Sequence, residues 1–164
     1  MEIKKLVTDL TVYEDRKELP AEWYNLLSIA YESAKKAYAP YSRFYVGAAI
    51  LLENGEIVTG SNQENCAYPS GLCAERTTAF YASAHYPNVA FKKIAIIAIN
   101  PQTKLTTPVP PCGACRQVLS EYEQLFKSNI EVLFAAEEGP VYKVNSVGDL
   151  LPFSFGADFL PAED

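Results

Sequence analysis

Two short cysteine-containing segments constrain this chain more than any other feature. The first is Cys73-Ala74-Glu75-Arg76, and the second is Pro111-Cys112-Gly113-Ala114-Cys115-Arg116. Zinc in proteins is usually bound by four ligands, and a catalytic zinc keeps one position open for water or substrate. The three cysteines therefore indicate an open zinc site that the fold must assemble from both segments. Glu75 follows Cys73 closely enough to move protons beside such a metal.

Neither segment is decisive by itself. A cysteine followed by a nearby glutamate arises readily by chance, and Cys112-x-x-Cys115 is equally typical of metal binding and of redox chemistry. Together, Cys-x-Glu and Pro-Cys-x-x-Cys form the signature of zinc enzymes that deaminate nucleobases. A thioredoxin-like redox protein is one alternative, but it leaves Cys73 and Glu75 unexplained. A structural zinc module is another, and it requires a fourth ligand, for which Cys66 is the candidate.

The composition indicates one globular domain. The chain has 164 residues, of which 49% are hydrophobic and 21% charged, and this length can bury a sizeable core. The formal net charge of -6 argues against polynucleotide binding, which needs a basic face. No apolar run has the length of a membrane span, and Met1 to Asp15 is charged throughout, unlike a signal peptide. We therefore expect a cytoplasmic protein with reduced cysteines and no nucleic-acid or membrane partner.

Hydrophobic periodicity predicts a helix, a hairpin, and then helices and strands in alternation. The helix that follows Pro20 has apolar residues at steps of three and four, and it ends by Tyr38 because Pro40 disfavours helix in the preceding residue. Asn54-Gly55 between two apolar runs is a strong hairpin signal. The further predicted elements are strands over 44–52 and 57–60, a helix over 72–85, a strand over 93–99, a helix over 112–126, a strand over 130–135 and an edge strand over 141–144.

This order predicts an α/β fold with three layers, α/β/α, around a mixed central sheet. Residues 1–20 are assigned to an N-terminal arm, within which residues 1–18 form a short strand or an extended arm, and residues 21–164 are assigned to a single catalytic domain. Cys73 is expected in the first turn of one helix and Cys112 at the start of another. Ligands of open α/β sheets bind where such helices begin, and helix N-termini stabilise thiolates. We therefore expect two helices to direct their N-termini at one zinc ion.

Several further segments accompany the two cysteine motifs. They are Tyr41-Ser42-Arg43-Phe44-Tyr45-Val46-Gly47-Ala48-Ala49, Gly60-Ser61-Asn62-Gln63-Glu64-Asn65, Tyr68-Pro69-Ser70-Gly71-Leu72, Gln117-Val118, Leu150-Leu151-Pro152 and Ser154-Phe155-Gly156. With these segments the sequence resembles the cytidine deaminase family, in its short form with one zinc domain per chain. The resemblance covers about residues 22 to 160 and leaves the first 20 residues outside.

The resemblance implies a homotetrameric hydrolase of pyrimidine salvage that converts cytidine and deoxycytidine to uridine and deoxyuridine, with release of ammonia. Cys73, Cys112 and Cys115 would hold one Zn²⁺ per chain; hydroxide formed there would attack C4 of the cytosine ring, and Glu75 would shuttle protons. The other implied contacts are Phe44 with the base, Asn62 and Glu64 with the ribose, Cys66, Ala67 and Tyr68 with the substrate of an adjacent subunit, and Phe155 from a neighbouring subunit.

A role for Arg76 is inferred from the charge of the zinc site rather than from the resemblance. Three thiolates around a dication leave a net negative charge, which weakens zinc as a Lewis acid. A guanidinium group hydrogen-bonded to the thiolates would withdraw some of that charge. We therefore assign Arg76 to the surroundings of the zinc ligands.

Cys66 stands where the family leads us to expect a small residue such as alanine. As a fourth zinc ligand it would close the site; otherwise it packs as a small apolar side chain. A deaminase of another substrate also stays open, such as a blasticidin-like nucleoside, a deoxycytidine nucleotide or a base in RNA. The net charge of -6 counts against RNA, and Phe44, Asn62 and Glu64 favour free pyrimidine nucleosides. The preference between cytidine and deoxycytidine is left open.

Overall fold

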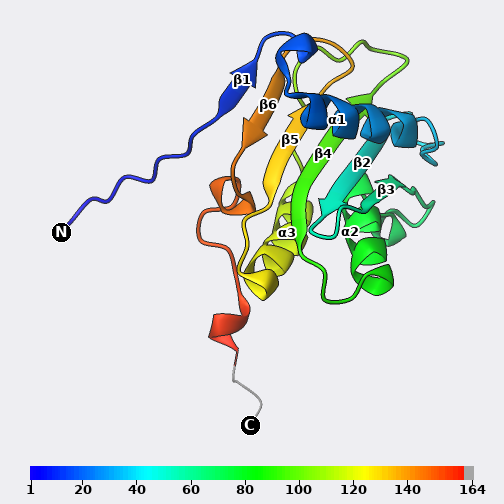
Figure 1. Ribbon diagram of the computed structural model, residues 1–164. Helices are drawn as coiled ribbons and strands as arrows, with labels where there is room; N and C mark the ends of the chain where they lie inside the picture. Colours follow the sequence, from blue (N-terminus) through cyan, green and yellow to red (C-terminus); the bar gives the residue numbers. More distant parts are fainter. Residues whose placement is uncertain (161–164) are drawn as a thin grey trace.

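The computed structural model describes residues 1–160, and its elements form three layers (Figure 1). A six-stranded sheet lies between helix α1 on one face and helices α2 and α3 on the other. The helices are α1 (Ala21–Ala34), α2 (Ala74–His85) and α3 (Gly113–Phe126). The strands are β1 (Thr11–Tyr13), β2 (Tyr45–Leu52), β3 (Ile57–Ser61), β4 (Phe91–Ile99), β5 (Glu131–Ala135) and β6 (Val141–Val144). The predicted three-layer α/β fold is confirmed.

The sheet is mixed, as predicted. Its strand order is β1-β6-β5-β4-β2-β3. Strands β4 and β5 pair in parallel, and the other neighbouring strands pair antiparallel. The β2–β3 hairpin turns at Asn54-Gly55, where Gly55 has a φ of 88° that residues with a side chain rarely adopt. The parallel pair needs a long crossover, and the segment from residue 100 to residue 130, which contains α3, provides it.

Helix α1 packs closely on β2. Its buried face includes Trp23, Leu26 and Ala30. Gly47 in β2 permits the close approach, because a Cβ atom at that position would lie 2.0 Å from the carbonyl oxygen of Ala30. A single methyl group there would force the helix away from the sheet, so this contact fixes the spacing between the two layers.

The predicted end of this helix at Tyr38 was wrong, since α1 ends at Ala34. The backbone of Tyr38 is paired elsewhere: its N–H donates to the carbonyl of Asn62 at 3.0 Å, and its carbonyl accepts the N–H of Glu64 at 2.8 Å. These bonds hold the segment after α1 against the segment after β3. They replace the bonds that a longer helix would have made.

The N-terminal segment contributes a strand to the sheet. Thr11 in β1 lies opposite Lys143 in β6, and the two strands run antiparallel. The strand predicted over 141–144 is present as β6, but it does not lie at the edge of the sheet, because β1 covers that edge. Residues 1–10 are exposed and extend away from the sheet (Figure 1). None of the helices within residues 1–160 combines the length and the apolar character needed to cross a bilayer.

Helices α2 and α3 cover the opposite face of the sheet and pack on buried residues of β4, β5 and β2. Helix α2 leads into β4, and α3 follows the same strand. Both helices therefore begin near the carboxyl end of β4. This arrangement brings the two cysteine segments together.

Candidate metal centre and pocket

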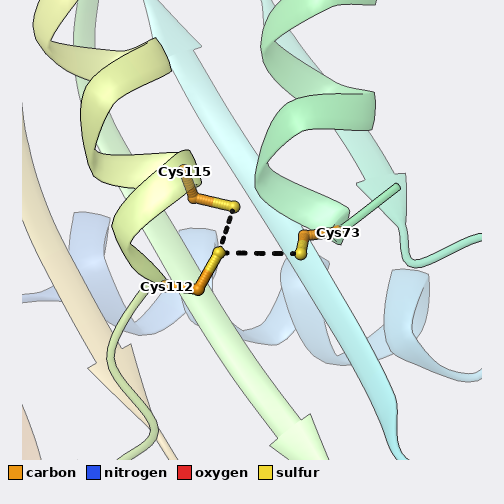
Figure 2. A group of neighbouring side chains, drawn as sticks. All are labelled: Cys73, Cys112 and Cys115. Carbon is orange, nitrogen blue, oxygen red and sulfur yellow. Dashed lines mark hydrogen bonds between the residues drawn. The ribbon is translucent and has the colours of Figure 1, made fainter. Parts of the chain in front are cut away.

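Three cysteine side chains meet where α2 and α3 begin (Figure 2). Cys73 is the N-cap of α2, Cys112 is the N-cap of α3, and Cys115 lies in the first turn of α3. The sulfur atoms all lie within 4.8 Å of one another. The Sγ atoms of Cys73 and Cys112 are 3.8 Å apart, and those of Cys112 and Cys115 are 3.3 Å apart. Cys73 was expected inside the first turn, and it instead occupies the position just before that turn.

The donor set fits Zn²⁺. Tetrahedral coordination with Zn–S bonds of about 2.3 Å places two sulfur ligands about 3.8 Å apart, which is the separation of Cys73 and Cys112. Within residues 1–160 this group has three members, so a tetrahedral ion would retain one position for water or substrate. Cys66 does not belong to the group; it is exposed and its thiol contacts the neighbouring Asn65. The geometry gives no support to a site closed by Cys66.

The charges around the sulfur atoms favour a bound cation. Hydrogen bonding with Cys115, and then with Arg76, lowers the pKa of the Cys73 thiol to about 5, although burial acts in the opposite direction. The same interaction with Cys73 raises the pKa of Cys115. Burial is the largest single effect on Arg76 and acts to lower its pKa, but hydrogen bonding and charge interactions with Cys73 and Cys115 together outweigh burial, and the pKa is raised. One thiolate is thus stabilised by a guanidinium, and a dication is required for all three thiols to ionise together.

Glu75 provides a buried carboxyl group beside the sulfur atoms. It is the second residue of α2, and only 5% of it is exposed. Burial is the main reason why its pKa is raised to about 7. A carboxyl group that titrates near neutrality can accept a proton in one step and return it in another.

A cavity of about 610 Å³ opens beside the cysteine group. The predicted site residues that line it are Phe44, Asn62, Glu64, Tyr68, Cys73, Glu75, Arg76 and Cys112. Cys66, Ala67 and Phe155 do not line this cavity, and Cys115 is fully buried next to it. The wall also includes Ser42, Val109 and Pro110, to which the sequence analysis gave no role. A volume of this size is ordinary for a small-molecule site.

Asn62 and Glu64 are held by the backbone of the segment before β2. The amide of Asn62 donates to the Phe44 carbonyl at 2.9 Å and accepts the Val46 N–H at 2.8 Å. The carboxylate of Glu64 accepts the N–H groups of Tyr41 and Ser42 at 2.9 and 3.2 Å, and it also accepts the Ser42 hydroxyl. The Ser42 hydroxyl is the main reason why the pKa of Glu64 is lowered. The carboxylate is therefore charged and directed toward the pocket wall that carries Phe44.

Phe155 lies outside the cavity of its own chain. It is 58% exposed, and its ring stacks on that of Phe159 with ring centroids 5.7 Å apart. The side-chain amide of Gln117 in α3 donates a hydrogen bond to the Phe155 carbonyl. Tyr68 lines the cavity and is 76% exposed. Contacts of Phe155, Cys66 and Ala67 with the substrate of another subunit stay predictions.

Comparison with known proteins gives a consistent picture. The family model of the cytidine and deoxycytidylate deaminase zinc-binding region matches residues 22–127, which include the three cysteines and Glu75. The cytidine deaminase of Halalkalibacterium halodurans is 39% identical over 133 residues, which are 81% of this chain and 93% of that protein. The cytidine deaminase of Mycobacterium tuberculosis H37Rv is 39% identical over 142 residues, which are 87% of this chain and 96% of that protein.

The fold of this chain is also similar to that of a solved structure. The crystal structure of cytidine deaminase from Burkholderia pseudomallei superposes with a TM-score of 0.70 at 41% sequence identity. The superposition covers 80% of this chain and 98% of that chain. The likeness therefore extends over nearly all of the relative and leaves part of this chain unmatched.

Proposed function

Because this chain belongs to the cytidine and deoxycytidylate deaminase family, we propose that it hydrolyses cytidine and deoxycytidine to uridine and deoxyuridine. One water molecule is consumed and one ammonia molecule is released in each reaction. The observation that carries the proposal is the three-cysteine group with the buried Glu75 carboxyl beside it, on one wall of a cavity of about 610 Å³. Cys73, Cys112 and Cys115 would hold a Zn²⁺, which would act as a Lewis acid and lower the pKa of a bound water molecule toward neutrality.

Glu75 is the proton carrier in this proposal. It accepts a proton from the attacking water and delivers it to N3 of the cytosine ring as C4 gains an oxygen. It then takes the second proton from the hydroxyl group now on C4 and passes it to the amino group, which leaves as ammonia while C4 becomes a carbonyl carbon. The raised pKa, about 7, suits a group that must be both base and acid. Burial at 5% exposure keeps bulk water from competing for these protons.

The hydrogen bonds that Asn62 and Glu64 already make leave room for one sugar hydroxyl. An amide has two N–H donors, of which Asn62 uses one for the Phe44 carbonyl. A carboxylate has about four acceptor sites, and Glu64 uses three for Tyr41 and Ser42. One donor and one acceptor remain, which match the oxygen and hydrogen of a single hydroxyl. A site that binds only the 3′-hydroxyl accepts both ribose and deoxyribose.

Further features favour a free nucleoside over a nucleotide or a nucleic acid. The charged Glu64 repels a phosphate on the sugar side of the pocket. The net charge of -6 disfavours RNA and DNA, whose binding needs a basic face. Phe44 is half-buried on the cavity wall, where its ring can stack on a pyrimidine.

We also propose that the chain assembles as a homotetramer. Phe153, Phe155 and Phe159 are 91%, 58% and 73% exposed, and such apolar surface is commonly covered by a partner. Phe155 would then reach the pocket of a neighbouring copy, and Cys66, Ala67 and Tyr68 would contact substrate there. A cytoplasmic location and a role in pyrimidine salvage belong to the same proposal. Light scattering of the purified protein checks the assembly, and a monomer at working concentration contradicts it.

Ammonia release from cytidine, deoxycytidine and deoxycytidine monophosphate tests the function. The protein is purified with its zinc content measured, and Glu75→Ala serves as the inactive control. We expect turnover of both nucleosides, little turnover of the monophosphate, and loss of turnover in the variant with zinc retained. A protein that contains zinc but turns over neither nucleoside would point to another substrate. A protein that cannot bind zinc would favour the redox alternative.

A further inference from the structure

The hydroxyl group of Ser42 connects two residues that the proposed function places on different parts of the substrate. The hydroxyl donates to Oε1 of Glu64, the residue proposed for the sugar. The oxygen of the same hydroxyl accepts the N–H of Phe44 at 3.0 Å, the residue proposed for the base. Ser42 also lines the cavity and is exposed. Its hydroxyl is therefore a direct bridge between the sugar side and the base side of the pocket.

The Glu64 carboxylate has no other side-chain hydroxyl partner among residues 1–160. Its Oε2 atom accepts the backbone N–H groups of Tyr41 and Ser42 at 2.9 and 3.2 Å. The two N–H groups hold one oxygen, and the Ser42 hydroxyl holds the other. Loss of the hydroxyl leaves the carboxylate free to turn about the oxygen that the backbone still holds.

The backbone between these residues makes the bridge more important. Arg43, which separates Ser42 from Phe44, has a φ of 52°, in the left-handed region that residues with a side chain seldom occupy. Such a conformation is retained only where surrounding contacts enforce it. The bond from the Phe44 N–H to the Ser42 oxygen spans Arg43, and on the far side the Phe44 carbonyl is held by Asn62. The position of the Phe44 ring thus depends on the same hydroxyl that orients Glu64.

We propose that Ser42 is a positioning residue. It holds the Glu64 carboxylate and the Phe44 ring at relative positions that allow them to bind the sugar and the base of the same nucleoside. The inference rests on the proposed function. Ser42 does not contact the reacting atoms. Its effect is on the binding of substrate, through Glu64 and Phe44.

Steady-state kinetics with cytidine test this role in the zinc-loaded protein. Ser42→Ala removes the hydroxyl, and Ser42→Thr keeps it. Ser28→Ala is the matched control, because Ser28 is an exposed serine on α1 whose hydroxyl bonds only to the Tyr24 carbonyl. Since a hydrogen bond to a charged group is lost, we expect Ser42→Ala to raise KM by about 10-fold, with kcat within about 3-fold of the wild type. Ser42→Thr and Ser28→Ala should stay within about 3-fold in both constants.

A double-mutant cycle shows whether Ser42 acts through Glu64. If it does, Ser42→Ala should raise KM by a clearly smaller factor in the Glu64→Ala background than in the wild type, because only its effect through Phe44 remains. Multiplied penalties in the double variant would show that the two residues act independently, and would overturn the inference. So would wild-type kinetics in Ser42→Ala, or a failure of Ser42→Thr to retain activity. Zinc content and melting temperature, measured for each variant, separate these results from misfolding.

The experiments distinguish a failure of the proposed function from a failure of the role of Ser42. A wild-type protein that holds zinc and releases no ammonia from cytidine overturns the proposed function, and the role of Ser42 falls with it. Wild-type turnover together with an unchanged KM in Ser42→Ala overturns only the role of Ser42.

Discussion

The sulfur atoms of Cys73 and Cys112 lie 3.8 Å apart, although the two residues are 39 positions apart in the sequence. Each caps the N-terminus of a different helix, α2 or α3. Neither helix alone presents enough ligands for a zinc site. The metal centre therefore depends on the packing of both helices against the sheet, and metal binding should stabilise that packing.

Two cysteine substitutions should have opposite results. Cys115 is fully buried in the sulfur group, so Cys115→Ala removes a ligand and should lower the zinc content well below the one ion per chain expected for the wild type, with loss of activity. Cys66 is exposed and outside the group, so Cys66→Ala should keep its zinc. Elemental analysis of the two purified variants checks this. Loss of zinc from Cys66→Ala would mean that the fourth position is closed by that thiol.

Substitution of Glu75 by its amide should separate chemistry from metal binding. Glu75→Gln keeps the shape of the side chain but cannot accept a proton from water. We expect kcat to fall by about 10²–10⁴-fold, which is the usual contribution of a general acid–base. The zinc content should be unchanged, because Glu75 is not one of the three sulfur donors. A variant that loses zinc in proportion to its activity would make Glu75 a structural support of the metal.

Arg76 should affect turnover more than metal retention. After the larger effect of Cys115, Arg76 helps to lower the pKa of the Cys73 thiol, so its guanidinium stabilises the thiolate. Groups of this kind commonly change metal affinity or activity by about 10–100-fold. We expect Arg76→Ala to lower kcat per bound zinc by about that factor, and Arg76→Lys to restore part of it. Zinc content measured beside kcat decides the matter, since equal losses of both would leave Arg76 only a structural role.

The carboxylate of Glu64 should titrate differently once the Ser42 hydroxyl is removed. Hydrogen bonding from Ser42 is the main cause that lowers the pKa of Glu64, so the charged form persists to lower pH than in a free glutamate. Ser42→Ala should therefore raise the pKa of Glu64 toward its ordinary value. Carbon-13 NMR of the glutamate carboxyl groups, assigned with Glu64→Gln, follows this titration. An unchanged pKa would show that the backbone N–H groups alone hold the charge.

Much of the fold could be predicted from local sequence signals. The hairpin at Asn54-Gly55 and the helices that begin at the cysteine segments follow from turn chemistry and periodicity, which act over a few residues. The gathering of Cys73 with Cys112 and Cys115 could be predicted from metal chemistry, because three thiols in this pattern serve few other purposes.

Features that depend on distant contacts could not be predicted. Helix α1 ends early because the backbone of Tyr38 pairs with Asn62 and Glu64, on the far side of the hairpin. A short strand was one possibility for the N-terminal residues, but its pairing with β6 could not be predicted. Ser42 lies in one of the segments that carry the family resemblance, but the sequence alone does not show that its hydroxyl reaches Glu64. Its role becomes visible only when the Glu64 carboxylate is seen against it.

The segment between β4 and α3 has a consequence for how such a protein can change. Val109 and Pro110 on this loop form part of the cavity wall, while the metal ligands next to them belong to α2 and α3. Loops tolerate insertions and replacements that helices and strands do not. The shape of the pocket can therefore be altered, by natural variation or by a designer, without rebuilding the metal centre. We expect substitutions at Val109 and Pro110 to change which substrates fit the cavity more readily than substitutions in α2 or α3.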